Sequence, residues 1–232
     1  MGGYGQFCPV AKAAEVVCER WTPLILRELL VGSTHFNEIH RGVPACSPTL
    51  LSKRLKELER AGVIDRDVVG RSVIYRLTDA GRELYPVILG LGEWGQRWSR
   101  TDYRGDDLDP GLLLWDVRRG LTPGGLGDAT VTIELVFPAM PPSRRHFWLV
   151  DDTREVDLCV SDPGRDVDVV VEADLRALTE IWLGDTSFRD ALAARRVELS
   201  GPSRLTGRFP DWFGSHPRFA HIRAGRLDGS AA

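Results

Sequence analysis

The sequence predicts an α+β protein built from two domains, and three observations lead to that expectation. The chain has 232 residues, enough for two hydrophobic cores of ordinary size. Up to about residue 100, apolar residues recur mainly at helical spacing. Beyond residue 110, a helix is expected at 112–121, strand-like alternation follows it, and helical periodicity then returns. We therefore expect an antiparallel sheet covered by helices in the second half.

Composition indicates a globular protein, with 43% hydrophobic and 27% charged residues. No apolar run reaches the roughly 18 residues of a membrane span, and the N-terminus lacks the pattern of a signal peptide. We expect a cytoplasmic protein with no membrane partner. The four cysteines are scattered without CxxC spacing, so we expect neither a disulfide scaffold nor a metal site, and no cofactor.

Charge is distributed unevenly along the chain. Residues 1–100 carry 14 basic and 11 acidic side chains, whereas residues 101–232 carry 16 basic and 22 acidic ones. A mildly basic first half and an acidic second half favour a nucleic-acid partner for the first and a different task for the second.

The most informative stretch is Ser47–Ile64, which predicts a helix with two different faces. Ser47 and Pro48 are typical of a helix start, and Gly62 of a helix end. Leucines recur at i, i+4 and i+7 and form an apolar stripe. The opposite face carries short hydroxyls and cations, which can contact phosphates and base edges in a major groove. The predicted DNA contacts here are Ser47, Thr49, Ser52, Lys53 and Lys56.

The neighbouring segments favour a DNA-binding interpretation over an ordinary surface helix. A helix is expected at 9–19, a second starts from a Thr22-Pro23 cap, and a third spans 35–40. The last of these, a turn and the Ser47 helix form a helix-turn-helix. Alternating residues on both sides of Gly70-Arg71-Ser72 then predict a β-hairpin, or wing. Arg71 at its tip is a candidate for the minor groove or a phosphate; the alternative is a solvated turn residue.

A further helix is expected over Ala80–Arg100, capped by Thr78-Asp79 and bent at Pro86. Its apolar stripe exceeds what a small domain can bury, which favours a two-fold homodimer. The alternative is packing onto the second domain. The expected interface residues are Leu84, Val87, Ile88, Leu91, Trp94 and Trp98.

Residues 8–98 resemble the HxlR-type winged helix-turn-helix transcriptional regulators. The resemblance rests on the Cys-Pro start, ERWTPLILREL, SPTLLSKRLKELERAG, the YRLT-AG junction and LGEWG, which occur in that order. It implies a homodimeric regulator, often a repressor, of double-stranded operator DNA that senses electrophiles, oxidants or small aromatic molecules. In some members the cysteine of the Cys-Pro pair is a reactive thiol, which makes Cys8 a candidate redox sensor. A small buried side chain is the alternative for Cys8.

The second half begins after a polar, acidic linker at 101–111, and a tail is expected at 215–232. Between them, residues 112–214 resemble the sterol-carrier-protein-2-like (SCP2-like) fold in the order of strands, helix, Trp182-Leu183-Gly184, helix, strand and Gly201. This resemblance implies a hydrophobic tunnel for a lipid-like or polycyclic effector. Packing in the core is the alternative for its aromatic residues. The candidate wall residues are Phe137, Phe147, Trp148, Trp182, Phe188, Phe209 and Trp212.

No sequence motif of an enzyme is evident. The five histidines lie outside HExxH spacing, and neither GxSxG nor a P-loop occurs. We therefore expect no catalytic residues and weigh three interpretations. The first is a DNA-binding regulator gated by a small ligand in the second domain. The second is a regulator whose second domain serves assembly only, with or without thiol sensing at Cys8. The third is a lipid carrier or enzyme with an incidental winged helix.

Overall fold

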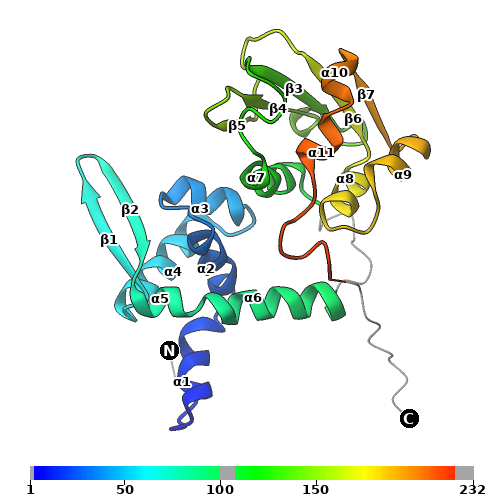
Figure 1. Ribbon diagram of the computed structural model, residues 1–232. Helices are drawn as coiled ribbons and strands as arrows, with labels where there is room; N and C mark the ends of the chain where they lie inside the picture. Colours follow the sequence, from blue (N-terminus) through cyan, green and yellow to red (C-terminus); the bar gives the residue numbers. More distant parts are fainter. Residues whose placement is uncertain (1–2, 100–107, 223–232) are drawn as a thin grey trace, which may run out of the picture. The chain divides into compact units, whose positions relative to one another are not determined.

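The structure, a computed structural model, describes residues 3–99 and 108–222 (Figure 1). The chain divides into two compact units, Met1–Gly92 and Glu93–Ala232. Of the expected linker at 101–111, residues 101–107, with Asp106 and Asp107, lie outside the described part. Asp109 caps the helix that begins at Pro110: its Oδ1 accepts a 2.9 Å hydrogen bond from Leu112 N. Within the described ranges, every helix is too short or too polar to cross a membrane.

The first unit contains the expected helices followed by a hairpin. Its elements are α1 (Pro9–Val17), α2 (Thr22–Leu30), α3 (Phe36–Gly42), α4 (Pro48–Arg60), β1 (Ile64–Val69), β2 (Ser72–Leu77), α5 (Asp79–Glu83) and α6 (Tyr85–Trp94) up to Gly92. One core joins α2, α3, α4 and the start of β1, with Ile25, Leu26 and Ile39 fully buried. This is the architecture of a winged helix-turn-helix.

Two expectations for these helices are wrong. The cap of α2 is Trp21, in a left-handed conformation with φ of 76°, and Thr22 is a buried helical residue instead. The expected helix over Ala80–Arg100 is divided: α5 ends at Glu83, α6 begins at Tyr85, and a π-helical turn, η1 (Gly95–Ser99), follows. Pro86 has no N–H to donate to the carbonyl of Arg82, so a continuous α-helix is interrupted there.

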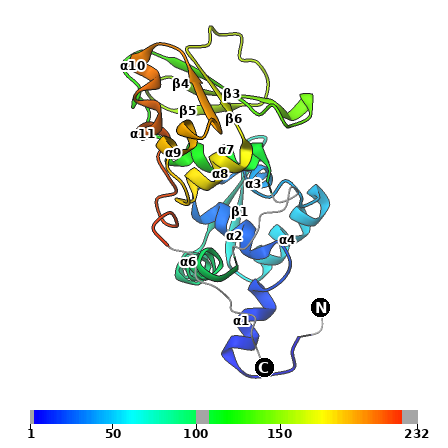
Figure 2. The same cartoon turned by 90° about the vertical axis from the view of Figure 1, so that its right-hand side faces the viewer.

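The second unit is a five-stranded sheet with helices on one face (Figures 1 and 2). Its elements are α7 (Pro110–Gly120), β3 (Val131–Val136), η3 (Pro142–Arg144), β4 (His146–Asp151), β5 (Val156–Cys159), β6 (Val169–Ala173), α8 (Leu175–Trp182), α9 (Phe188–Ala193), β7 (Val197–Ser200), α10 (Ser203–Thr206) and α11 (Phe209–Phe213). Alternate strand residues, Ile133, Leu135 and Leu149 among them, are buried beneath the helices. The α+β class is confirmed.

The sheet is mixed rather than antiparallel, which corrects the sequence expectation. The strand order is β5-β4-β3-β6-β7, and β3 pairs in parallel with β6, with Ile133 opposite Val169. The cause is topological: β4 and β5 extend the sheet on one side of β3, and the chain then returns along residues 160–168 to the other side. Apolar alternation within a strand carries no information about which strand lies beside it.

The described part of the expected tail, residues 215–222, instead packs against α8 and the turn after it. The backbone N–H of His216 donates to the carbonyl of Trp182 at 2.6 Å. Gly184 approaches the backbone of Ala220 so closely that a Cβ would lie 2.3 Å from its oxygen. Ile222 is buried. These contacts anchor the segment to the helical side of the second unit.

Candidate nucleic-acid interface

Helix α4 presents one face to the core and the other to solvent. The Ser47 hydroxyl accepts a hydrogen bond from Leu50 N at 3.3 Å, which satisfies one free N–H of the first turn. Leu51, Leu55 and Leu58 are at most 2% exposed, so they fix the helix on the core. Gly62 takes a φ of 72° just beyond the helix, a conformation that glycine adopts without steric penalty. The helix and both of its ends are therefore as the sequence predicted.

The polar face of α4 contains all five of its predicted DNA contacts. Ser47, Thr49, Lys53 and Lys56 are exposed, and Ser52 is half-buried. The ammonium of Lys53 lies 3.9 Å from a carboxylate oxygen of Glu57, and the Lys53 side chain is 62% exposed. An exposed ion pair of this kind contributes little, so Lys53 can exchange Glu57 for a phosphate. The face combines hydroxyls with cations and suits contact with a nucleic-acid backbone.

Arg54 has a role that the sequence interpretation missed. The residue is 8% exposed, and its guanidinium donates to the Arg20 carbonyl at 3.1 Å, to Glu57 at 2.6 Å and to Glu19 at 2.7 Å. These bonds join α4 to the segment between α1 and α2. The available signal was position: Arg54 lies at i+3 from Leu51, on the same stripe as the buried leucines. It therefore orients the helix that carries the polar face.

A buried carboxylate on α2 fixes the position of α3, the first helix of the motif. Glu28 on α2 is fully buried and accepts hydrogen bonds from the Arg27 guanidinium at 2.9 Å and from the Ser33 hydroxyl at 3.3 Å. Arg27 also donates to the carbonyl of Gly42 on α3 at 2.7 Å. A Cβ at Gly42 would lie 1.9 Å from the Glu28 carboxyl, so only glycine fits there. The spacing between α2 and α3 is fixed in this way.

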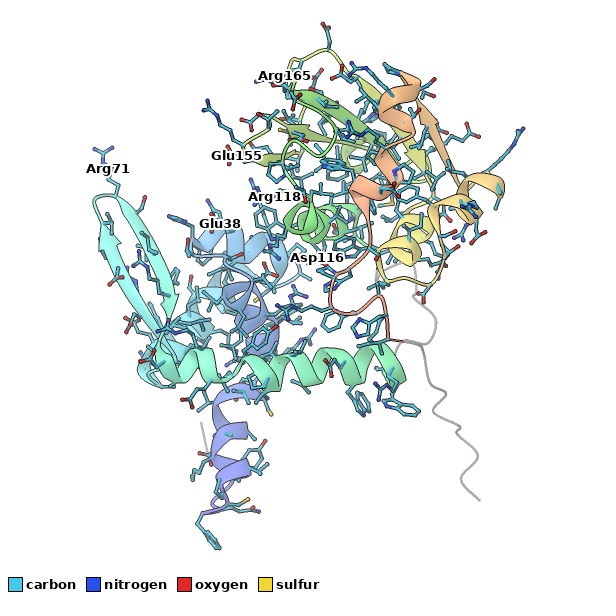
Figure 3. The ribbon with its side chains drawn as sticks, viewed as in Figure 1. Glu38, Arg71, Asp116, Arg118, Glu155 and Arg165 are labelled. Carbon is cyan, nitrogen blue, oxygen red and sulfur yellow. The ribbon has the colours of Figure 1, made fainter. Side chains whose placement is uncertain are left out.

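Helix α3 starts with a capping box in which Glu38, labelled in Figure 3, reaches back over the first turn. One Glu38 carboxylate oxygen accepts from the backbone N–H groups of Thr34 at 2.8 Å and His35 at 3.0 Å. Partial burial tends to raise the pKa of Glu38. The two N–H donors and the nearby His35 outweigh burial, so the pKa lies below its ordinary value. The ionised form of Glu38 thus stabilises the start of α3.

The wing is a regular two-stranded hairpin with Arg71 at its tip (Figure 3). Val69 pairs with Ser72, so the turn is Gly70-Arg71 and Ser72 already belongs to β2. Arg76 on β2 forms an ion pair with Asp67 on β1. Figure 3 shows the Arg71 side chain pointing beyond the two strands. Arg71 is exposed, in a position from which a wing residue can reach a nucleic-acid backbone.

Comparison with known proteins agrees with this geometry. The family model for "HxlR-like helix-turn-helix" matches residues 16–103. The chain is 40% identical over 112 residues to the uncharacterised HTH-type transcriptional regulator YvaP of Bacillus subtilis, covering 47% of this chain and 95% of that protein. The chain belongs to the HxlR-like helix-turn-helix family. This confirms the resemblance seen in the first half of the sequence, and this HxlR-type protein is a transcriptional regulator.

Two further proteins are similar to this chain over a comparable share of its length. The uncharacterised HTH-type transcriptional regulator YdeP of Bacillus subtilis is 38% identical over 95 residues, which are 40% of this chain and 74% of that protein. The reduced form of the transcriptional regulator YodB from B. subtilis is 34% identical, covers 39% of this chain and 93% of that chain, and has a TM-score of 0.35. The family model ends at residue 103, so most of the second unit of the HxlR-type chain lies beyond it.

The six expected dimer residues of this HxlR-type chain fall into two groups. Val87, Leu91 and Trp94 are 47%, 54% and 56% exposed. Leu84 and Ile88 are half-buried and pack on the core of the first unit, and Trp98 is also half-buried. The exposed group gives α6 an apolar surface in the described chain.

Cys8 and Cys46 of the first unit differ in environment. Cys8 is half-buried and precedes α1, where its side chain makes no cap hydrogen bond. Cys46 is fully buried. Burial raises the pKa of the Cys46 thiol, although the charge of Arg54 acts in the opposite direction. Cys46 is therefore held as a neutral thiol beneath the start of α4.

Most of the aromatic candidates in the second unit pack against one another. Phe137, Phe147, Trp182, Phe188, Phe209 and Trp212 are each at most 8% exposed. Ring centroids of Phe188 and Phe213 lie 5.2 Å apart, and Phe213 was missing from the sequence prediction. Trp148 is half-buried outside this cluster and stacks on His146. Apart from Trp148, the candidate rings belong to the hydrophobic core of the second unit.

Two cavities lie beside the ring cluster. One of about 900 Å³ is lined by Ile181, Phe188 and Pro210 together with polar residues such as Ser187 and Arg189. Another of about 410 Å³ is lined in part by Trp212, whose indole N–H donates to the carbonyl of Thr122 at 2.9 Å. Of the seven predicted wall residues, only Phe188 and Trp212 line these two cavities.

Proposed function

We propose that this HxlR-type regulator binds a pseudo-palindromic DNA operator as a homodimer and represses transcription. The DNA contact is inferred from the difference between the two faces of α4. One face packs on the protein through Leu51, Leu55 and the hydrogen-bonded Arg54. Lys53 and Lys56 on the other face are exposed. A helix held this firmly can place short hydroxyls and cations in a major groove without a further conformational cost.

Arg71 supports the same proposal from the wing. It is separated along the hairpin from the ion pair of Arg76 with Asp67, which joins the two strands across their exposed face. A cation at the wing tip contacts the phosphate backbone or the minor groove beside the site of α4. Phosphate contacts position a protein on DNA, and base contacts from α4 provide the specificity.

The dimer is proposed to form through α6. Val87, Leu91 and Trp94 project apolar side chains into solvent from a single helix. A two-fold axis through such a surface places two α4 helices on half-sites separated by about one turn of DNA, or a multiple of it.

The second domain, residues 112–214, is proposed to be SCP2-like and to hold a small hydrophobic or aromatic effector. The cavity beside Phe188 has an apolar floor that continues into the ring cluster, and its rim is polar. Ligand sites commonly combine apolar walls with a few polar groups. The effector is assigned to this cavity because Phe188 lines it and also packs against the other rings of the core.

A second candidate is a regulator whose C-terminal domain serves assembly only, with or without thiol sensing at Cys8. The dense packing of Phe209, Phe213 and Trp182 favours it, because such rings behave as an ordinary core. The position of Cys8 before a helix start favours the thiol.

One titration separates these candidates. An operator is first selected from random duplex DNA with the full chain. The affinity for 1-pyrenebutanol, an uncharged polycyclic probe, is then measured with and without that operator. Ligand gating requires the two affinities to differ, by about 5–150-fold in typical cases of coupling. Equal affinities would leave the C-terminal domain as a scaffold, and failure to select any DNA would contradict the proposed DNA binding itself.

A further inference from the structure

A cavity of about 590 Å³ lies in the first unit, at the base of the wing. Its walls come from the end of α2, from β2 and from the α5–α6 junction, and Figure 1 shows β2 and α5 meeting at the foot of the hairpin. The side chains that define its chemistry are Leu29, Leu30, Tyr75, Arg76, Arg82 and Tyr85. A volume of this size is typical of sites for small organic molecules. We propose that this wing-base cavity binds a small aromatic carboxylate.

The charge of the lining favours an anion. Two arginines line the cavity, and all of its lining residues within the described chain are otherwise uncharged. Arg82 donates to the carbonyl of Leu77 at 2.6 Å and to Asp79 at 2.6 Å. A guanidinium carries five N–H donors, so these two bonds leave capacity for another acceptor. A carboxylate in the cavity can be bound by Arg82 while the Leu77 contact persists.

Competition from the existing ion pair is weak. The Asp79 side chain is 95% exposed and that of Arg82 is 62% exposed. Water screens an ion pair in such a position, and its net contribution is small. A ligand carboxylate can add a charge-assisted hydrogen bond to a guanidinium N–H that the contacts with Leu77 and Asp79 leave available. Arg82 is therefore suited to an anionic ligand.

The remaining walls favour a flat ring. Tyr75 and Tyr85 are half-buried, Leu30 is half-buried and Leu29 is buried. Aromatic rings stack on tyrosine faces and pack against branched apolar side chains. A sugar has no aromatic ring and inorganic phosphate has no apolar surface, so neither would complement these walls. The combination of a cation with apolar and aromatic walls identifies an aromatic carboxylate as the matching chemistry.

The cavity is lined in part by β2, the strand that follows Arg71 at the wing tip. The Tyr75 N–H donates to the carbonyl of Thr34 at 2.8 Å, and Arg76 bridges to Asp67 on β1. A ligand that favours one placement of β2 therefore favours one placement of the wing tip, and this changes DNA affinity. This consequence rests on the proposed function, whereas binding to the cavity does not.

The test compares two probes of the same shape on the full chain by calorimetry: 2-naphthoate, which is anionic, and 2-naphthamide, which is neutral. We expect naphthoate to bind about tenfold more tightly, because only its charge engages Arg82. Arg82→Gln should abolish this preference. Arg66→Gln, which removes an exposed wing arginine outside the lining, should keep it.

A second variant should raise the affinity for naphthoate, and it leaves every lining residue of the cavity unchanged. Asp79→Asn removes the carboxylate that shares Arg82, so naphthoate affinity should rise about threefold while naphthamide affinity stays the same. This variant decides the question if circular dichroism shows that Arg82→Gln is unfolded. Equal affinity for the two probes in the wild-type protein would overturn the proposal, as would a charge preference insensitive to both variants. Operator binding without naphthoate tests the proposed function separately.

Discussion

Arg54 donates a 2.7 Å hydrogen bond from Nη2 to the carboxylate of Glu19, which lies 35 residues earlier in the chain. The side chain of Arg54 is 9% exposed and that of Glu19 is 36% exposed. Together with the Arg20 carbonyl and Glu57, this pair fixes the orientation of α4 relative to the start of α2.

Replacing Arg54 with methionine should therefore loosen α4. The change leaves the Arg20 carbonyl and two carboxylates without their donor, at a cost of about 2–3 kcal/mol. Amide hydrogen exchange of peptides from α4 should accelerate by about 30-fold or more. Lys56→Met, on the exposed side of the same helix, should change the rate by less than threefold, or about 0.5 kcal/mol. Equal protection in Arg54→Met and the wild-type protein would show that the pair does not hold α4.

Glu38 predicts a pH dependence with a definite sign. Its pKa in the folded state lies below the ordinary value, so its contribution to stability is present above the unfolded-state pKa. That contribution is lost as the pH falls through the folded-state pKa. Glu38→Gln removes this titration and keeps an acceptor. The variant should be less stable than the wild type at pH 7, and the difference should shrink at pH 3.

The measurement for Glu38 is the thermal midpoint of both proteins at the two pH values. The side chain is 40% exposed, so water reduces the effect, and a cap of this kind contributes about 0.5–1 kcal/mol. Glu59→Gln, on an exposed residue of α4, serves as the control and should give the same difference from wild type at both pH values. A Glu38→Gln difference that grows on acidification would contradict the assigned sign.

The apolar surface of α6 predicts a dimer, and one charged side chain introduced into that surface should disrupt it. Leu91 is 54% exposed, so Leu91→Glu should leave the fold intact and prevent burial of this surface at an interface. Multi-angle light scattering at micromolar concentration should give a dimer for the wild type and a monomer for the variant. Val31→Glu, a similarly exposed position outside α6, should remain a dimer. A monomeric wild-type protein would rule out this interface.

Thiol sensing predicts that Cys8 determines the response to a quinone. Operator binding by the wild type should fall after treatment with 1,4-benzoquinone, and Cys8→Ser should retain it. Cys18→Ser removes an exposed thiol near the same helix and should respond like the wild type. If Cys8→Ser loses operator binding as the wild type does, Cys8 is not the sensor.

The sequence was most informative where one local signal determined the structure. The Ser47 cap, the leucine stripe and Gly62 defined α4, and the Gly70-Arg71 turn defined the wing. It was least informative where distant contacts decide. The buried role of Arg54 depends on Glu19, and the parallel pairing of β3 with β6 depends on how the chain returns to the sheet.

The same difference between local signals and distant contacts applies to the candidate sites. The polar face of α4 follows from helical periodicity, so its residues could be listed from the sequence alone. Whether Phe209 or Trp182 lines a tunnel or fills a core depends on the volume left between sheet and helices, which composition does not determine. Hydrophobic patterning places a ring in the interior but does not set its neighbours, and here those neighbours are other rings.

The measurement that tests the central claim most directly is the affinity of Lys53→Glu for the selected operator. The matched control is Arg204→Glu, which makes the same charge change at an exposed residue of α10. If α4 contacts DNA, Lys53→Glu should weaken binding by about tenfold or more, and the salt dependence should become less steep because fewer counterions are released. Arg204→Glu should bind within about twofold of the wild type. Operator affinity and salt dependence unchanged in folded Lys53→Glu would contradict the assignment of α4 as the DNA-reading helix.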